Sequence, residues 1–226
     1  MFKNLPNDSK QYLEAELKKL GLNIENIDLI LSYCDYILET NKQINLTRIK
    51  PEDFIALQVI DSLIGLKAID DHKPKAGNKL LDIGTGGGFP GVILGLARPD
   101  ILVTVIDGTG KKIKVIQDWL EENNIKNITA VHARAEEYAK VMENANAFDF
   151  ITAKAVSNLK ELIPLVVPLL LQGGCAVLYK GPDAEQEIAD AKYVIRKYDI
   201  YLKILDNFTI SAGGNTVVRK VILLTK

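Results

Sequence analysis

The chain is poor in the residues that build disulfide frameworks and histidine metal sites. Its 226 residues include two cysteines and two histidines. Cys34 and Cys175 lie far apart among apolar residues, without the spacing of metal ligands, so we expect reduced core residues in a cytoplasmic protein. With only His72 and His132 available, a histidine-rich metal site is excluded, and no metal is expected.

Long apolar runs and an excess of charge of one sign are also missing. The longest apolar run, residues 162–171, is interrupted by Pro164 and Pro168, so it is too short and too broken to span a bilayer. Residues 1–10 are polar and lack the apolar core of a signal peptide. The net charge of −1 gives no global basic signature for nucleic acid, so such a function has to come from a local patch.

Hydrophobic spacing divides the chain into two parts. Residues 1–70 show helical periodicity, which predicts an N-terminal helical extension. Over residues 71–226, strands and helices alternate, which predicts a second domain with a doubly wound α/β sheet, parallel until a C-terminal hairpin. Helices are expected at 9–20, 26–42, 51–68, 91–97, 110–123, 135–143 and 158–171, and strands at 79–83, 102–106, 128–132, 148–153, 175–179, 200–208 and 217–225.

The turn over residues 82–91 is the most informative segment. An apolar run ends there in Asp-x-Gly-x-Gly-x-Gly, and a helical pattern follows, which is typical of a buried strand that turns around a ligand. Gly84 and Gly86 lack a Cβ and can bring the backbone against a cofactor. A dinucleotide fingerprint would have glycine at position 89, where this chain has Phe89. The loop therefore indicates a nucleotide-like ligand other than a dinucleotide.

Two acids help to choose the ligand. Asp107 ends the second expected strand, where a carboxylate can accept both ribose hydroxyls of an adenosine, a solvated strand-end acid being the alternative. Asp82, beneath the loop, could hold the methionine amino group of S-adenosylmethionine (SAM) and offset its sulfonium charge, whereas it would repel a pyrophosphate. SAM is therefore favoured over NAD.

Three further residues belong to the expected cofactor pocket. Ala135 and Glu136 follow the third strand, where an adenine ring would rest, although Glu136 could instead favour a helix N-terminus. Phe89 could supply an apolar contact at the mouth of the site, or it could be a core aromatic that opens a helix.

A set of short motifs is spread over nearly the whole chain: Asn45-Leu46-Thr47, Asp61-Ser62-Leu63, the run 82–91, Asp107 followed by Lys111-Lys112, Arg134-Ala135-Glu136 and Lys180-Gly181-Pro182. With these motifs the chain resembles the GidB family (glucose-inhibited division protein B), class I methyltransferases that act on a guanine N7 of small-subunit (16S) ribosomal RNA. The coupling of Asn-Leu-Thr to Gly-Phe-Pro-Gly is the most specific part of the resemblance.

The resemblance implies a fold, a cofactor and a partner. The fold is a Rossmann-like, mostly parallel seven-stranded sheet with a C-terminal antiparallel hairpin. The cofactor is SAM, contacted by Gly84, Phe89, Ala135 and Glu136. The partner is ribosomal RNA or the small ribosomal subunit, and nothing in the sequence demands more than a monomer.

Three positions depart from the family pattern. Lys154 stands where the family usually has the arginine of Ser-Arg-Ala, Gln58 where it has histidine, and Gly108 where it has serine. Lysine keeps the charge of arginine but loses its planar bidentate fork. A paralogue with another RNA or small-molecule target, or a SAM-binding regulatory protein without turnover, therefore stays open as an alternative.

Methylation of guanine N7 asks little of the protein's own acids and bases. N7 has an in-plane lone pair and no proton, so its attack on the methyl group needs orientation and desolvation but no general base. We expect Lys154, at the tip of the fourth strand, to act in catalysis through orientation and charge or to wall the cofactor pocket, an exposed strand-end lysine being the alternative.

Basic residues recur where the expected strands end. Lys111 and Lys112 open a helix, where a cation costs up to about 1 kcal/mol, and this suggests a use such as phosphate binding. The expected contacts with substrate RNA are Arg48, Lys111, Lys112, Arg134 and Lys180.

Overall fold

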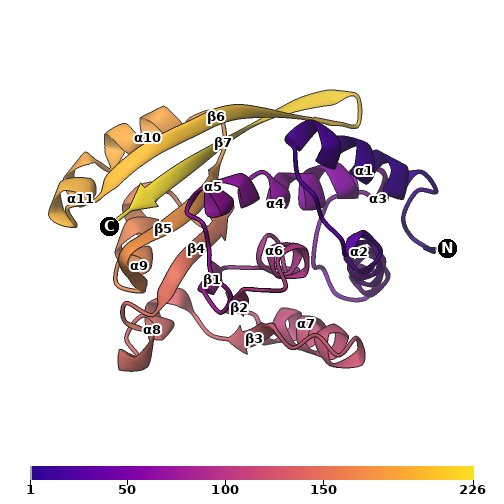
Figure 1. Ribbon diagram of the computed structural model, residues 1–226, viewed down its shortest axis with the longest axis horizontal. Coiled ribbons are helices and arrows are strands. Elements are labelled where there is room, and N and C mark those ends of the chain that lie inside the picture. The colour runs from indigo at the N-terminus through magenta and orange to yellow at the C-terminus, as the bar shows by residue number, and fades with distance from the viewer. Residues whose placement is uncertain (1) are drawn as a thin grey trace.

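A sheet of seven strands runs through residues 2–226, the part of the chain described by the computed structural model (Figure 1). In spatial order the strands are β3 (Ile128–His132), β2 (Leu102–Asp107), β1 (Lys79–Ile83), β4 (Phe148–Lys154), β5 (Leu170–Lys180), β7 (Asn215–Thr225) and β6 (Tyr201–Ala212). β1 to β5 are parallel, and β7 lies antiparallel between β5 and β6. The mostly parallel sheet and its closing hairpin, with the turn at Gly213–Gly214, are as the sequence predicts.

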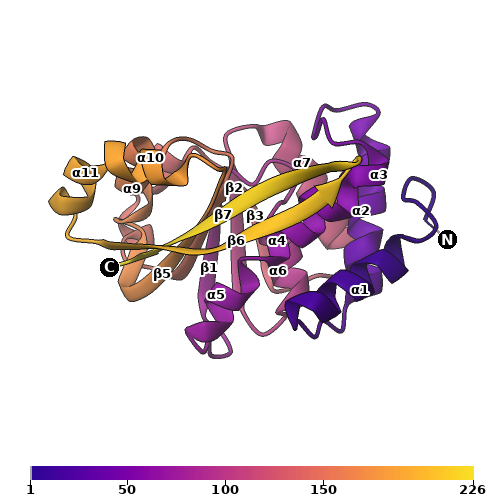
Figure 2. The same ribbon diagram turned by 90° about the horizontal axis from the view of Figure 1, so that it is seen from above.

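Helices cover both faces of the sheet (Figure 2). On one face lie α1 (Ser9–Leu20), α2 (Ile27–Asn41), α3 (Pro51–Phe54), the π-helix η1 (Ile55–Ile60), α4 (Asp61–Leu63), α5 (Leu66–Asp71), α6 (Gly91–Ala97) and α7 (Gly110–Glu122). On the other face lie α8 (Ala135–Tyr138), the 3-10 turn η2 (Met142–Asn144), α9 (Leu159–Val166), α10 (Ala184–Asp190) and α11 (Lys192–Lys197). None of the helices described between residues 2 and 226 is long and apolar enough to cross a bilayer.

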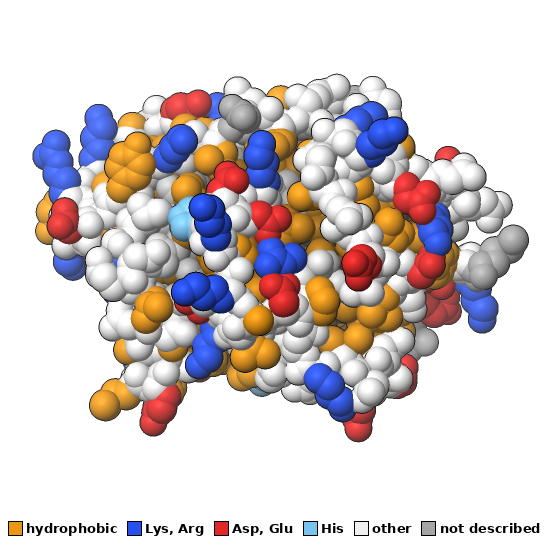
Figure 3. All heavy atoms as spheres, viewed as in Figure 1, with side chains coloured by type: hydrophobic (Ala, Val, Ile, Leu, Met, Phe, Trp, Pro, Cys, Tyr) orange, Lys and Arg blue, Asp and Glu red, His pale blue; other side chains and the backbone are white. Residues whose placement is uncertain are grey.

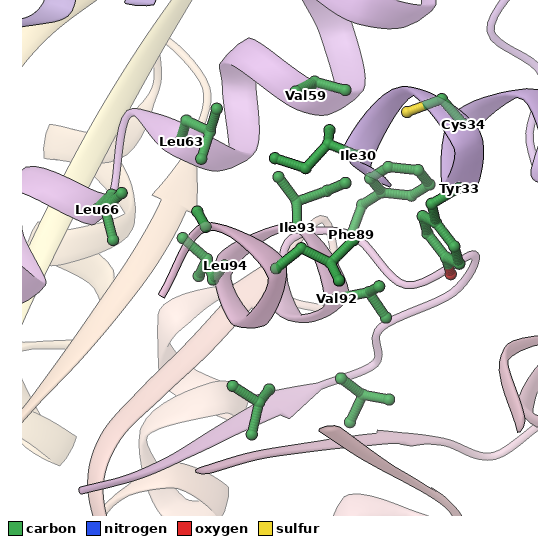
Figure 4. Packing of buried hydrophobic residues seen from close by; sticks show 14 of the residues in the cluster. Ile30, Tyr33, Cys34, Val59, Leu63, Leu66, Phe89, Val92, Ile93 and Leu94 are labelled. Atoms are coloured by element: carbon green, nitrogen blue, oxygen red, sulfur yellow. The ribbon is translucent and has the colours of Figure 1, made fainter. Parts of the chain in front are cut away.

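The N-terminal helices share one hydrophobic core with the helices that follow β1 and β2 (Figure 4). Ile30 and Tyr33 of α2 and Val59 of η1 pack beside Phe89, which precedes α6, and Ile93 of α6. Residues 2–70 therefore form part of the layer over the sheet, and a domain boundary at residue 70 stays a prediction.

The sequence misplaces some element boundaries. The expected helix over 158–171 is wrong beyond Val166, because Pro168 has no N–H with which to continue the helical hydrogen bonds. The chain instead enters β5 at Leu170, five residues before the expected strand, through an irregular register against β4. The helices α10 and α11 are not expected from the sequence.

The expected helix over 51–68 is divided by the π-helix η1 and broken at Gly65. Gly65 permits close packing here, since a Cβ on it would meet the Tyr179 side chain of β5. π turns are rare and are found frequently at functional sites. This segment carries Gln58 and leads directly into Asp61, and both side chains contact the end of β4.

Candidate SAM-binding site

A cleft of about 510 Å³ opens at the carboxyl ends of β1, β2 and β4, the edge at which open α/β sheets bind ligands. Its volume is in the range of small-molecule sites. Five residues expected from the sequence line it: Gly84, Asp107, Arg134, Ala135 and Glu136. The other lining residues are Ile83, Ile106, Gly108, Ala133, Val156, Ser157, Glu161 and Leu165.

The glycine loop takes the backbone conformation that its sequence predicts. Gly84 and Gly86 have φ angles of +69° and +58°, in the left-handed region that favours glycine. The Gly86 amide donates to Asp107 Oδ2 at 2.9 Å, and the Thr109 amide donates to Asp107 Oδ1 at 2.8 Å. A carboxylate has about four acceptor sites, so Asp107 can brace the loop and still accept from a ribose.

Asp82 lies beneath the loop rather than in the wall of the cleft. Its carboxylate is fully buried, accepting from the Gly91 amide at 2.9 Å and the Thr152 hydroxyl at 2.8 Å. Burial raises the pKa of Asp82 to about 6, while the hydrogen bonds and the Lys154 cation oppose the shift. Asp82 therefore joins β1, β4 and α6 and places a negative charge under the loop.

From the raised pKa of Asp82 we expect SAM binding to weaken in acid, because protonation removes the negative charge under the loop. At pH 5 only about one tenth of the Asp82 carboxyl is ionised, so we expect SAM to bind about tenfold more weakly than at pH 7. The same rise in the pKa of Asp82 makes the free energy of unfolding fall as pH rises from about 4 to about 6, because the folded chain binds the proton more tightly.

Calorimetric titration with SAM from pH 5 to 8 measures the pH dependence of SAM binding. Asp82→Asn is the control and should show a flat profile; a flat profile in the unsubstituted protein contradicts the prediction.

Phe89 is a core aromatic, and the structure does not bring it to the cleft. The side chain is 5% exposed, and its ring centroid lies 5.8 Å from that of Tyr33 and 5.6 Å from that of Phe54 (Figure 4). The Tyr33 hydroxyl donates to the Gly87 carbonyl at 2.8 Å. Helix α2 thus holds the glycine loop from behind, a role for Tyr33 that its place on an apolar helix face does not reveal.

The Lys154 side chain, at the end of β4, is only 11% exposed, and it does not line the cleft. Its ammonium donates to Gln58 Oε1 at 3.0 Å, lies 3.5 Å from Asp61 Oδ2, and stands 5.8 Å from the centre of the Phe89 ring. Burial lowers the pKa of Lys154, and Asp61 opposes the shift. Gln58 and Lys154, two positions that depart from the family pattern, are therefore in direct contact.

The other basic residues expected at this edge divide into two groups. Lys180 is only 8% exposed, because its ammonium donates to the Ser157 carbonyl at 2.5 Å and pairs with Glu187 at 2.7 Å. The structure thus places Lys180 inside the protein, where its ammonium is occupied by protein partners. Arg134 is exposed in the wall of the cleft, Lys112 is half-buried, and Arg48 and Lys111 are exposed.

Asp61 and Arg219 form an ion pair beside Lys154, a pairing that the sequence does not predict. Asp61 is 1% exposed and accepts two hydrogen bonds from the Arg219 guanidinium of β7, at 2.7 and 3.0 Å. Asp61 belongs to the Asp61-Ser62-Leu63 motif, which could have drawn attention to it. Arg219 is a single arginine in a strand, and no sequence pattern indicates its role.

The lining residues suit a cationic nucleoside. The charged lining residues are three carboxylates, those of Asp107, Glu136 and Glu161, and one guanidinium, that of Arg134. This excess of negative charge favours a sulfonium over a pyrophosphate. Apolar side chains of both walls, Ile83, Ile106, Val156 and Leu165, provide surface for an adenine ring. Among the side chains that the structure describes, no three His, Cys, Asp or Glu residues are grouped as metal ligands.

Solved structures with the same architecture include several methyltransferases. A SAM-dependent methyltransferase from Aquifex aeolicus aligns with a TM-score of 0.52 at 17% identity, covering 77% of this chain and 93% of that chain. Precorrin-6y C5,15-methyltransferase from Geobacter metallireducens aligns with a TM-score of 0.53 at 15% identity, covering 72% and 87%. At these identities the likeness shows the fold alone.

Sequence comparison is more specific. The GidB family model, described as rRNA small subunit methyltransferase G, matches residues 26–209. The ribosomal RNA small subunit methyltransferase G of Desulfitobacterium hafniense is 33% identical over 221 residues, covering 96% of this chain and 89% of the relative. That of Clostridium novyi is 35% identical over 182 residues, covering 80% and 74%. The chain belongs to the GidB family.

Proposed function

We propose that this protein transfers the methyl group of SAM to N7 of a guanine in the 16S RNA of the small ribosomal subunit. The observation that carries the proposal is the cleft: it lies beside the glycine loop, contains the acid expected to bind ribose, and has more carboxylates than cations. Family membership supports ribosomal RNA as the substrate, since the relatives are named small subunit methyltransferases.

In this proposal the protein's residues bind and orient, and bound SAM supplies a methyl group on a positively charged sulfur. Asp107 would accept hydrogen bonds from the ribose hydroxyls, and Ile106 and Ala135 of the cleft lining would provide surface for the adenine ring. Guanine N7 has no proton to lose, so its attack on the methyl group needs no general base from the protein. Positioning and desolvation of N7 are then the main contributions to the rate.

Arg48, Lys111, Lys112 and Arg134 are proposed to contact RNA phosphates. Lys111 and Lys112 open α7, directly after β2, and Arg134 lies in the cleft wall, so these three are at the carboxyl edge of the sheet. On the face seen in Figure 3, basic and acidic side chains are interspersed without a continuous basic area. A local patch at the carboxyl edge therefore accounts for RNA binding better than the general surface does. We also propose a cytoplasmic monomer in which residues 1–70 form the N-terminal extension.

The proposal predicts 7-methylguanosine in the product. Small subunits and isolated 16S RNA that lack the modification would be incubated with the protein and tritiated SAM, and the RNA would be digested to nucleosides. We expect the label in 7-methylguanosine. Label in another nucleoside or a small molecule would favour a paralogue with another target. SAM binding without transfer to any acceptor would favour a SAM-binding regulatory protein. Tight NAD binding without SAM binding would reject the proposed function and both of these alternatives.

A further inference from the structure

The turn of residues 155–157, between β4 and α9, forms one wall of the cleft and fits the glycine loop closely. Ala155 has a φ angle of +56°, in the left-handed region that costs energy for a residue with a Cβ. Val156 and Ser157 line the cleft, and a Cβ on Gly84 would stand only 2.8 Å from Val156 Cγ2. A wall with this conformation needs support from neighbouring residues.

One end of the turn is held by Lys154. Its ammonium is fixed by Gln58 and Asp61, and Asp61 is fixed in turn by the two hydrogen bonds from Arg219. A buried cation is stable only where partners compensate its lost hydration, so the Lys154 side chain has little freedom to move. The residue that follows it along the chain is the strained Ala155.

The other end is held by Lys180, which extends from the end of β5. It donates to the Ser157 carbonyl and is itself paired with Glu187 of α10. The same Glu187 oxygen, Oε2, accepts from the Leu159 amide at 3.0 Å, so one carboxylate holds both the lysine and the start of α9. Two buried lysines thus hold the turn from its two ends.

We propose that Lys154 and Lys180 are positioning residues that clamp the 155–157 turn in the shape that binds SAM. This inference rests on the proposed function for its choice of ligand; it selects the pocket wall from the roles that the sequence suggests for Lys154, and it changes the role suggested for Lys180. Lys154 acts through the wall of the cleft and not on the guanine, and Lys180 acts on the Ser157 carbonyl and not on RNA.

Calorimetry with SAM tests the clamp without any RNA, so its outcome is independent of whether ribosomal RNA is methylated. Lys154→Met and Lys180→Met keep most of each stem and remove the charge. We expect each to weaken SAM binding about tenfold, the effect of losing one hydrogen bond to a charged group, and to speed amide exchange over residues 155–159. Lys160→Met is the matched control: Lys160 is exposed beside the same turn, has no ion pair among the described residues, and should leave both measurements unchanged.

Steady-state kinetics separate the clamp from the competing roles. With saturating SAM, the KM for the small subunit should stay within about twofold of the unsubstituted value, and Lys154→Arg or Lys180→Arg should restore most of the SAM affinity. A raised KM for the subunit with unchanged SAM affinity would mean direct RNA contact. A lowered Tm with unchanged SAM affinity and exchange would mean a purely structural role, and either result overturns the proposal. If a methionine variant does not fold, Asp61→Asn and Glu187→Gln loosen the two lysines without removing them, and the same outcomes apply.

Discussion

Replacement of Asp107 by alanine is expected to weaken SAM binding more than any other single change in the cleft. The side chain braces Gly86 and Thr109 and is the acceptor proposed for the ribose hydroxyls. A hydrogen bond to a charged group contributes about 1.5–3 kcal/mol, so the loss of one corresponds to about tenfold in Kd and the loss of two to about a hundredfold or more. Calorimetric titration with SAM measures the change directly.

Two variants control for effects unrelated to the ribose. Asp107→Asn keeps the size of the side chain and one acceptor oxygen, so its Kd should lie between those of the alanine variant and the unsubstituted protein. Asp118→Ala removes an exposed carboxylate of α7 that pairs with Lys114, and it should leave the Kd unchanged. An unchanged Kd in Asp107→Ala would place the SAM site elsewhere in the molecule.

The role expected of Asp107 could be predicted from the sequence because the pattern around it is local. A strand buried on both faces has a continuous apolar run, and a tight turn around a ligand needs glycine, so residues 79–91 specify their own structure. β1, β3, α1 and α6 have the predicted bounds. The order of these elements along the chain then brings Asp107 to Gly86, since parallel strands end at one edge.

The burial of charged and aromatic side chains could not be predicted in this way. A lysine that follows a strand looks like a solvent-exposed residue unless its partners are known. The partner of Lys154 at Gln58 is 96 residues away in the sequence, and Asp61 meets Arg219 across 158 residues. Phe89 is similar: its position after the glycine loop suggests a ligand contact, but Tyr33 and Phe54 of the N-terminal helices enclose it. These assignments depend on how the helices of residues 1–70 pack, which no local pattern records.

The same packing makes Gly88 the position at which a methyl group is expected to destabilise the protein most. Gly88 has a φ angle of +90°, and a Cβ there would fall well inside contact distance of the Tyr33 hydroxyl and 2.8 Å from Val92 Cγ2. Tyr33 cannot swing away, because it is fully buried and packs edge-on against Trp119 at 4.8 Å between ring centroids. We expect Gly88→Ala to lower the free energy of unfolding by about 3 kcal/mol or more, adding overpacking to the cost of left-handed backbone.

Urea unfolding with a matched glycine isolates the contact with helix α2. Gly173 also has a left-handed φ angle, +78°, but a Cβ there would meet no atom within 4 Å, so Gly173→Ala should lose only about 1–2 kcal/mol. Tyr33→Phe in the Gly88→Ala background removes the overlapping hydroxyl, and it should recover part of the lost stability although the hydrogen bond to Gly87 is gone. Equal losses in the two alanine variants would show that Tyr33 yields to the added methyl group, and that helix α2 does not hold the glycine loop in place.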